Sequence, residues 1–319
     1  MLTRDEIQVM IQISRMYYDN NLNQEDIAQK LGLSRQKVSR LLIEARVQGI
    51  VRISIYDPDP PDPNLRDQLI SRFGLRDVIL ASSEKLESDQ LRSAIGLVAA
   101  EHLLKVIQDD QTVGIGWGRT LFEVINLLHE GGNRHINVVP LIGGLGDISP
   151  FFQVNDLVRR LAEAFGGTYR HLYAPAFLQD SLVLDSLLKT PEIIQMKELW
   201  KRLDVVIIGI GHVGFQEISS MFFADHISPE TLDQLETIGA VGDICGWFYD
   251  GNGKPVNPNT GIIGIDLETL QSLPNVIGIA GGFEKVKAVL GALRGGYIKT
   301  LVTDTETARA VLNAENEGR

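Results

Sequence analysis

The sequence predicts an α/β protein in two parts, a small helical N-terminal module and a large domain built on a parallel sheet. Three helical hydrophobic patterns come before residue 50. The run DPDPPDP at 57–63 then favours a stiff extended spacer. After it, continuous apolar runs alternate with amphipathic helical patterns, which is typical of a parallel sheet covered on both faces. We expect a module at 1–56, a linker at 57–63 and the large domain at 64–319.

The composition is that of a globular protein, with 44% hydrophobic and 22% charged residues over 319 positions. Cys245 is the only cysteine, which excludes an internal disulfide and fits a reducing cytosol. The start MLTRDEIQVM lacks the basic and apolar regions of a signal peptide. The longest apolar runs, such as Val205 to Ile208, are too short to span a membrane. We expect a cytoplasmic protein with no membrane partner.

The net charge of −11 argues against nucleic-acid binding, but the charge is unevenly distributed. Between Lys30 and Arg52 six basic residues face one acidic residue, Glu44, so this window carries +5 and the rest of the chain −16. DNA responds to the field within a Debye length, about 8 Å at physiological salt, rather than to the total charge. The basic window is therefore compatible with DNA binding.

Three helices are predicted in the N-terminal module, with Asn23 and Ser34 as N-caps of the second and third. Gly32 turns the chain between these two helices. Apolar residues spaced three or four apart mark the inward faces: Ile7, Met10, Ile11 and Tyr18, then Ile27, Ala28 and Leu31, then Val38, Leu41, Leu42 and Ala45. Alternation of Val51, Ile53 and Ile55 predicts a strand, which would be the wing of a winged-helix-like module or a sheet edge.

The second and third helices have the pattern of a helix-turn-helix, with a small residue at the crossing, Ala28, and a glycine at the turn, Gly32. Arginine and glutamine have forked donors suited to guanine and adenine edges, while lysine and serine suit phosphates. We expect operator DNA to contact the outward face, which comprises Ser34, Arg35, Gln36, Lys37, Ser39, Arg40 and Arg46. The alternative is a plain amphipathic helix pair with a solvated basic face.

In the large domain five strands and five helices are predicted. The strands are Thr112–Gly116, Val138–Ile142, Val205–Gly209, Val276–Ala280 and Thr300–Thr303. The helices are Ser88–Ile107, Leu121–His129, Val154–Phe165, Glu284–Leu293 and Thr305–Leu312. In such a sheet ligands bind beyond the carboxyl ends of the strands.

Four glycine loops follow predicted strands. In the first, Gly116 and Gly118 open the backbone to a ligand, and Arg119, Thr120 and the helix N-terminus offer donors to an anion. Trp117 would stack on a sugar ring or fill a gap in the core. The others contain Gly143, Gly144 and Leu145, then Gly209 and Gly211, then Gly281 and Gly282. Each alone could be a plain turn, but together they favour a shared ligand cleft.

Two charged residues complete the predicted site. Asp243 lies among small and apolar residues, where a carboxylate is costly unless it is paired or meets ligand hydroxyls. Lys285 would offer a cation to a phosphate or to Asp243. The alternatives are a strand-end cap for Asp243 and a solvated helix residue for Lys285. The six histidines show no metal-ligand spacing, so we expect neither a metal nor a cofactor.

The chain resembles the SorC/DeoR-type sugar-sensing transcriptional regulators over nearly all of its length. The resemblance is carried by QEDIAQKLGLSRQKVSRLL, VGIGWGRTL, GGLGD, DVVIIGIG, GAVGDICGWFYDGNG, VIGIAGG and GGYIKTLVTDTETA. It implies an operator-binding domain and a Rossmann-like effector domain related to phosphosugar isomerases and deaminases. It also implies a dimer or tetramer that responds to a phosphorylated sugar.

By position, the family's phosphate and sugar contacts are implied at Gly116, Trp117, Gly118, Arg119, Thr120, Gly143, Gly144, Leu145, Asp243 and Lys285. Some members carry a basic residue just before the second glycine pair, in one branch as a Schiff base with the sugar. This chain has Ile142 there, which argues against a covalently held deoxyribose phosphate and weakens the case for fructose bisphosphate.

We therefore expect a regulator without enzymatic activity, whose operator affinity is controlled by a phosphorylated sugar. The alternative is a phosphosugar isomerase with a helical appendage. Isomerisation needs a positioned general base, for which Asp243 and Asp250 are the evident candidates. A further alternative is a DNA-binding protein whose large domain only oligomerises.

Overall fold

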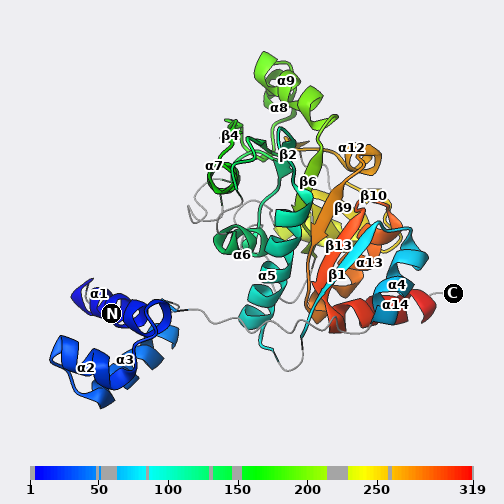
Figure 1. The fold of residues 1–319 in the computed structure, drawn as a ribbon. Coiled ribbons are helices and arrows are strands. Elements are labelled where there is room, and N and C mark those ends of the chain that lie inside the picture. Colours follow the sequence, from blue (N-terminus) through cyan, green and yellow to red (C-terminus); the bar gives the residue numbers. More distant parts are fainter. Residues whose placement is uncertain are drawn as a thin grey trace. The chain divides into compact units, whose positions relative to one another are not determined.

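The computed structural model describes residues 4–47, 50–51, 63–83, 86–128, 132–145, 153–213, 229–257 and 261–317. The chain divides into two compact units, residues 1–55 and 56–319 (Figure 1). Most of the strand predicted at 51–55 and of the linker predicted at 57–63 lies outside the described residues. Pro63 begins helix α4, a position that suits proline because the first helical residue needs no hydrogen-bonded amide.

The N-terminal unit contains the predicted helix-turn-helix. Its elements are α1 (Arg4–Ser14), the π-helical turn η1 (Arg15–Asp19), α2 (Gln24–Leu31) and α3 (Arg35–Val47). Asn23 caps α2 by accepting a hydrogen bond from the Asp26 amide at 2.9 Å. Gly32 ends α2 at φ 63°, a left-handed conformation that glycine adopts at little cost. The buried core consists of Ile13, Ile27, Ala28, Val38 and Leu42.

Within the described part of the large domain, seven strands form one parallel sheet in the order β1-β13-β12-β6-β2-β3-β4. The bounds are β1 (Asp77–Ala81), β2 (Thr112–Ile115), β3 (Asn137–Pro140), β4 (Thr168–Tyr169), β6 (Val205–Gly209), β12 (Val276–Ile279) and β13 (Thr300–Asp304). The five predicted strands are all present. The two that were not predicted, β1 and β4, are the edge strands, and both residues of β4 are exposed.

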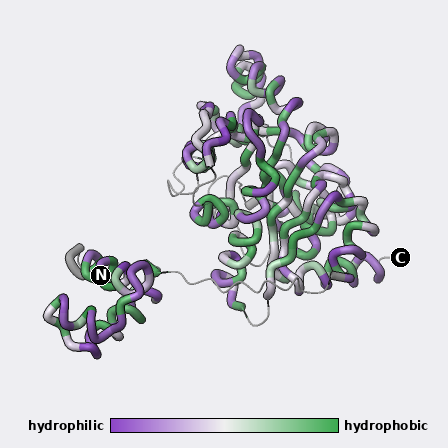
Figure 2. Tube along the Cα trace, in the orientation of Figure 1, coloured by the Kyte–Doolittle hydropathy of each residue, from purple (hydrophilic) through white to green (hydrophobic). Residues whose placement is uncertain are grey.

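Two groups of helices pack around this sheet. Helix α5 packs against α6 and α6 against α7, while α14 packs against α13 and α4. Every residue of β12 and β13 is buried, so these strands are covered on both faces, and Figure 2 shows the hydrophobic colour along the central strands. The bounds are α4 (Pro63–Phe73), α5 (Ser88–Val106), α6 (Arg119–Leu127), α7 (Val154–Ala164), α13 (Val286–Arg294) and α14 (Thr305–Glu317).

A smaller antiparallel sheet, absent from the sequence prediction, has the order β10-β9-β8-β7. It comprises β7 (Gly211–His212), β8 (Ala240–Ile244), β9 (Trp247–Asp250) and β10 (Pro255–Val256). Cys245 and Gly246 join β8 to β9 with φ angles of 50° and 83°, as a two-residue type I′ turn requires. The remaining elements are β5 (Phe177–Leu178), β11 (Gly261–Ile262), α8 (Ser181–Leu188), α9 (Pro191–Trp200), α11 (Pro229–Thr237), α12 (Leu267–Ser272) and η3 (Phe283–Lys285).

The order of the parallel strands reverses between β2 and β6. From β2 the chain proceeds to β3 and β4 on one side, and from β6 to β12 and β13 on the other. In open α/β sheets the loops that leave the two strands at such a reversal diverge, and ligands bind in the crevice between them. The topology therefore selects the carboxyl ends of β2 and β6 as the place for a site.

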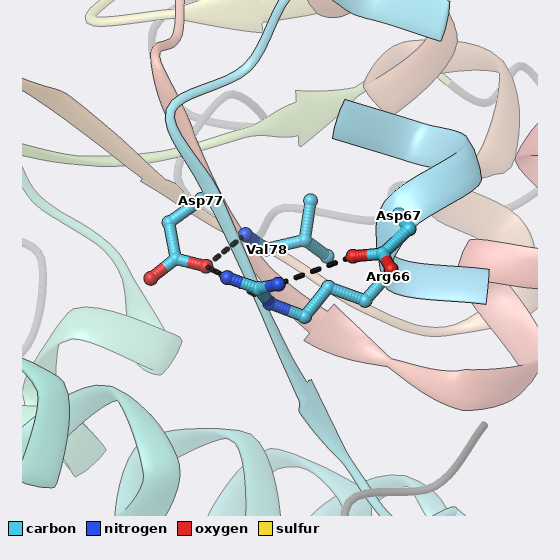
Figure 3. A network of polar contacts seen from close by, with 4 residues as sticks. All are labelled: Arg66, Asp67, Asp77 and Val78. Carbon is cyan, nitrogen blue, oxygen red and sulfur yellow. Dashed lines mark hydrogen bonds and ion pairs between the residues drawn. The ribbon is translucent and has the colours of Figure 1, made fainter. Parts of the chain in front are cut away.

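The first helix of the large domain is fastened to the edge of the sheet. Arg66 of α4 donates to Oδ1 of Asp77 in β1 at 2.7 and 3.1 Å, and the Val78 amide donates to the same oxygen (Figure 3). Arg72 of α4 pairs with Glu315 of α14, which also pairs with Arg294 of α13 at 2.7 Å. The helix that follows the predicted linker is thus joined to both β1 and α14.

Over the ranges that the structure describes, the helices are all too short or too polar to cross a membrane.

Candidate functional site: a cavity at the strand reversal

A cavity of about 150 Å³ lies beyond the carboxyl ends of β2, β6 and β12, where the strand order reverses. This volume accommodates on the order of ten water molecules, which suits a small polar ligand. Its wall comprises Ser88, Leu91, Arg92, Ile95, Trp117, Gly118, Arg119, Thr120, Leu121, Gly209, Ile210, Gly211, His212, Asp243, Cys245, Ile279, Gly281, Gly282, Glu284 and Lys285.

The loop after β2 leads directly into helix α6. Gly118 caps the helix at φ 129° and ψ 161°, a conformation open essentially to glycine alone. The first amides of a helix have no partner within the helix and lie at the positive end of its dipole, which favours an anion there. Arg119 adds a cation at this point, and its pKa is lowered by burial and by the nearby charge of Arg92. This wall of the cavity is suited to a phosphate or carboxylate.

Asp243 lies in β8, opposite Gly211 of β7. Its side chain is buried, and Oδ2 accepts the Gly246 amide of the hairpin turn at 3.2 Å. Oδ1 is buried and has no hydrogen-bond partner among the described residues. Burial raises the pKa of Asp243 to about 6, although the Gly246 amide and the charge of Lys285 oppose the rise. Oδ1 is therefore a buried acceptor in the wall of the cavity whose hydrogen-bonding capacity the described residues leave unused.

Lys285 borders the cavity from η3, just after Gly281 and Gly282. Its ammonium donates to the carbonyl oxygen of Ile210 at 2.7 Å. Burial lowers the pKa of Lys285 to about 8, while the charges of Asp243 and Glu284 oppose the fall. Asp243 acts on Lys285 through its charge and not through a direct contact, since the described residues show no ion pair between the two side chains. Lys285 retains donors for a ligand, since an ammonium carries three.

Asp304, the last residue of β13, is hydrogen-bonded to the turn that carries Lys285. Oδ2 of Asp304 accepts the Gly282 amide at 3.0 Å and the Thr307 hydroxyl at 2.5 Å, and Oδ1 accepts the Thr307 amide at 2.9 Å. A side chain at Gly281 would lie 2.4 Å from Oδ2, so the backbone must be glycine there. Asp304 thus fixes the position of this turn relative to the carboxyl end of β13.

Seven of the eleven predicted ligand residues border the cavity: Trp117, Gly118, Arg119, Thr120, Gly211, Asp243 and Lys285. Gly116 lies just outside it, with its amide bonded to the Ile207 carbonyl at 2.9 Å. The loop after β3 is elsewhere. Gly143 and Gly144 donate their amides to the carbonyls of Ile263 and Ala174, and Leu145 bonds to the Gln153 side chain. Three of the four glycine loops therefore meet around one cavity.

The sequence pattern did not identify His212, Glu284 or the α5 residues of the wall. His212 directly follows Gly211 in β7, and burial followed by the charges of Lys285 and Arg119 lowers its pKa to about 4, which leaves a neutral imidazole at pH 7. The α5 residues lie before the first glycine loop. Their only sequence signal is their spacing, since Ser88, Leu91, Arg92 and Ile95 recur on one face of the helix.

The second candidate surface is the outward face of α3 in the N-terminal unit. Arg35, Gln36, Lys37 and Arg40 are exposed, as are Ser34 and Arg46, while Ser39 is partly buried. Ser34 Oγ accepts the Lys37 amide at 3.2 Å and caps the helix. Val38 and Leu42 face the core. Of the seven predicted DNA contacts, Ser34 caps α3, five lie in its first two turns, and Arg46 lies in its last turn.

Chemically, the cavity can bind an anion and hydroxyl groups. A carboxyl whose pKa lies near 6 beside a partly buried ammonium would also suit general acid–base chemistry, as the isomerase alternative requires. No group of three histidine, cysteine or acidic side chains in the described ranges is placed to hold a metal ion.

Comparison with known proteins shows which protein family the chain resembles. Residues 62–313 match the family model Sugar-bind, "Putative sugar-binding domain". The sorbitol operon regulator of Klebsiella pneumoniae is 33% identical over 97% of this chain and 98% of its own. The deoxyribonucleoside regulator of Bacillus subtilis is 29% identical over 98% of this chain and 99% of its own. The LsrR transcriptional regulator of an Escherichia coli strain is 30% identical over 97% of this chain and 96% of its own.

The crystal structure of full-length SorC from Klebsiella pneumoniae has a similar fold, with a TM-score of 0.73 at 32% identity, covering 97% of this chain and 99% of that one. A DeoR-family regulator from Listeria monocytogenes gives 0.70 at 27% identity, covering 78% and 98%.

Proposed function

The chain belongs to the SorC/DeoR family of sugar-binding transcriptional regulators, and from this premise we propose that a phosphorylated sugar in the cavity controls its affinity for operator DNA. A protein of this family binds DNA and has a sugar effector. It is a regulator and not an enzyme, as the sequence predicted. The proposal concerns the phosphate, the residues that hold the effector, and the consequence for DNA.

The observation that carries the proposal is the convergence of opposite chemistries in one small cavity. The N-terminus of α6, Arg119 and Lys285 favour an anion. Asp243 offers a buried oxygen with no hydrogen-bond partner in the described structure, which suits a hydroxyl donor. A sugar phosphate carries both groups on one small molecule. Ile142, fully buried beside the β3 loop, agrees with a non-covalent complex.

For DNA we propose contacts from Ser34, Arg35, Gln36, Lys37, Ser39, Arg40 and Arg46. In helix-turn-helix dimers the half-sites are about 34 Å apart, so an effector that changes the spacing of two recognition helices weakens binding. Such coupling is typically worth about 1–3 kcal/mol. The protein would act in the cytoplasm, where its operator lies.

Assembly into a dimer or tetramer is part of the proposal, and α8 supports it. Five of its eight residues are apolar and none is buried. Leu184, Leu187 and Leu188 pack against the core, while Leu182 is 75% exposed and Val183 46% exposed. We infer that a partner subunit covers these two side chains. Leu182→Glu should lower the molar mass measured by light scattering. Asp185→Asn, on the same helix, is the control.

The test is thermal stability with a panel of phosphorylated sugars and their free forms. Binding to the folded state at about 100 times Kd adds about 2.7 kcal/mol to the free energy of unfolding. We expect stabilisation by a sugar phosphate and none by the free sugar. Arg119→Ala should abolish it and Arg159→Ala, whose side chain in α7 is 39% exposed and lies outside the cavity wall, should not. Stabilisation by no member of the panel would refute the sensor and leave a large domain that only oligomerises.

The DNA arm uses duplexes selected from a random pool by the wild-type protein. A stabilising sugar phosphate should change the Kd for these duplexes by about 5- to 150-fold. An unchanged Kd despite effector binding would contradict control of operator affinity.

A further inference from the structure

Helix α5 forms one wall of the cavity through its first two turns. Ser88, Leu91, Arg92 and Ile95 border the cavity, and Arg92 is the only charged member of the four. We propose that Arg92 is a second cation for the effector's phosphate, acting together with Arg119, and that it makes the site selective for a dianion. This inference rests on the proposed function and specifies the charge of its ligand.

The position of Arg92 supports this role. Its side chain is 21% exposed, so it is held against the cavity rather than extended into solvent. It lies close enough to Arg119 and to Lys285 for its charge to contribute to the lowered pKa of each. Two guanidinium groups in such proximity repel one another, and an anion placed between them removes the repulsion. A phosphate is therefore bound more strongly than either cation alone would predict.

The hydrogen bonds of Arg92 leave room for a ligand. Nη1 donates to Oδ1 of Asp89 at 2.6 Å, within the first turn of α5. Asp89 is 93% exposed, so this pair lies at the rim and is weakened by solvent. An arginine has five N–H donors, and Asp89 is the one acceptor found for Arg92 among the described residues. The remaining donors match the oxygens of a phosphate.

The wall of the cavity carries a net positive charge, which attracts a dianion more strongly than a monoanion. Three cations, Arg92, Arg119 and Lys285, border the cavity against two carboxylates, Asp243 and Glu284. A phosphate monoester carries about −1.5 to −2 charges near pH 7, whereas a sulfate monoester of the same shape carries one. A site with two arginines in its wall should distinguish the two, and a site with Arg119 alone should distinguish them less.

The experiment measures Kd by calorimetry for hexose and pentose monophosphates that bind the wild-type protein, and for the corresponding monosulfates. In Arg92→Gln we expect about a tenfold or greater loss of affinity for the phosphate, since a charge-assisted hydrogen bond is lost. The sulfate should lose less, so the preference for phosphate should shrink. Arg92→Lys should restore part of it.

Two matched variants separate ligand contact from structure. Asp89→Asn breaks the same ion pair but keeps the cation, so its affinity should stay equal to or above that of the wild type. Lys105→Gln removes one positive charge from an exposed position of α5, about 20 Å along the helix from Arg92, and should leave the affinity unchanged.

Equal losses for phosphate and sulfate in Arg92→Gln, or the same loss in Asp89→Asn, would overturn the inference and leave the proposed function standing. No binding of any monophosphate by the wild type would overturn both.

Discussion

The carboxylate of Asp243 rests directly on the backbone of Gly211. A Cβ atom at Gly211 would lie 1.8 Å from Oδ1 of Asp243, far inside any van der Waals contact. The two residues are paired across the antiparallel strands β7 and β8. Gly211 is thus the residue that makes room for a buried acid at the edge of the cavity.

Gly211→Ala should displace the Asp243 side chain and weaken effector binding at least tenfold. Overpacking of this kind typically costs about 1–3 kcal/mol of unfolding free energy. Calorimetry and urea denaturation measure the two effects. Gly251→Ala is the control, because its added Cβ would lie 3.9 Å from its nearest contact. Wild-type affinity in Gly211→Ala would contradict a ligand role for Asp243.

Asp243 should also make stability depend on pH. Its pKa is about 6 when folded against 3.8 for the reference value, so the folded state binds the extra proton. The stability that this proton contributes is present below pH 3.8 and is lost as the pH rises through 6. Wild type should therefore gain about 2 kcal/mol over Asp243→Asn between pH 7 and pH 4. Urea titrations of both proteins measure this difference, and parallel curves would show that Asp243 does not titrate near 6.

Effector affinity should be highest between about pH 6 and pH 8. Asp243 accepts a hydroxyl best when ionised, above its pKa of about 6, and Lys285 attracts a phosphate only while protonated, below its pKa of about 8. The second pKa of a phosphate, about 6, adds to the acid limb. Asp243→Asn should flatten part of that limb and leave the alkaline limb. Lys285→Arg should extend the alkaline limb to higher pH.

Lys37 should contribute to DNA affinity through phosphate contact. Lys37→Ala is expected to weaken binding to all duplexes alike and to reduce the slope of log Kd against log salt by about one. Arg35→Ala should instead change which bases are preferred, since its guanidinium suits a guanine edge. Lys197→Ala, at an exposed position of α9, serves as the control. A salt slope unchanged in Lys37→Ala would remove this residue from the interface.

Local signals allowed the sequence to predict the helix-turn-helix and much of the cavity. Asn23 and Gly32 cap the two ends of α2 through contacts with residues close by in the sequence, so their roles can be predicted from the sequence. The residues after β2, β6 and β12 meet because the carboxyl ends of neighbouring parallel strands share one edge. The sequence also suggested Asp243 and Lys285, although neither the Cys245–Gly246 turn nor the bond from Lys285 to Ile210 was foreseen.

Long-range backbone pairing could not be read from the sequence. The amide of Gly143 is bonded to the carbonyl of Ile263, which lies 120 positions away, and this pairing holds the second glycine loop away from the cavity. Arg92 was missed for a different reason. No turn or glycine precedes it, and an arginine on a helix resembles a solvated residue until the packing of α5 against α6 is known.

Helix α5 is a single rod of 19 residues, about 28 Å long. Its first two turns border the cavity, and the helix packs against β1, the strand to which Arg66 joins α4. A continuous helix of this length moves as a rigid body. An effector that draws Arg92 into the cavity would therefore tilt α5. The tilt would displace β1 and, through the Arg66–Asp77 ion pair, helix α4 at the start of the large domain.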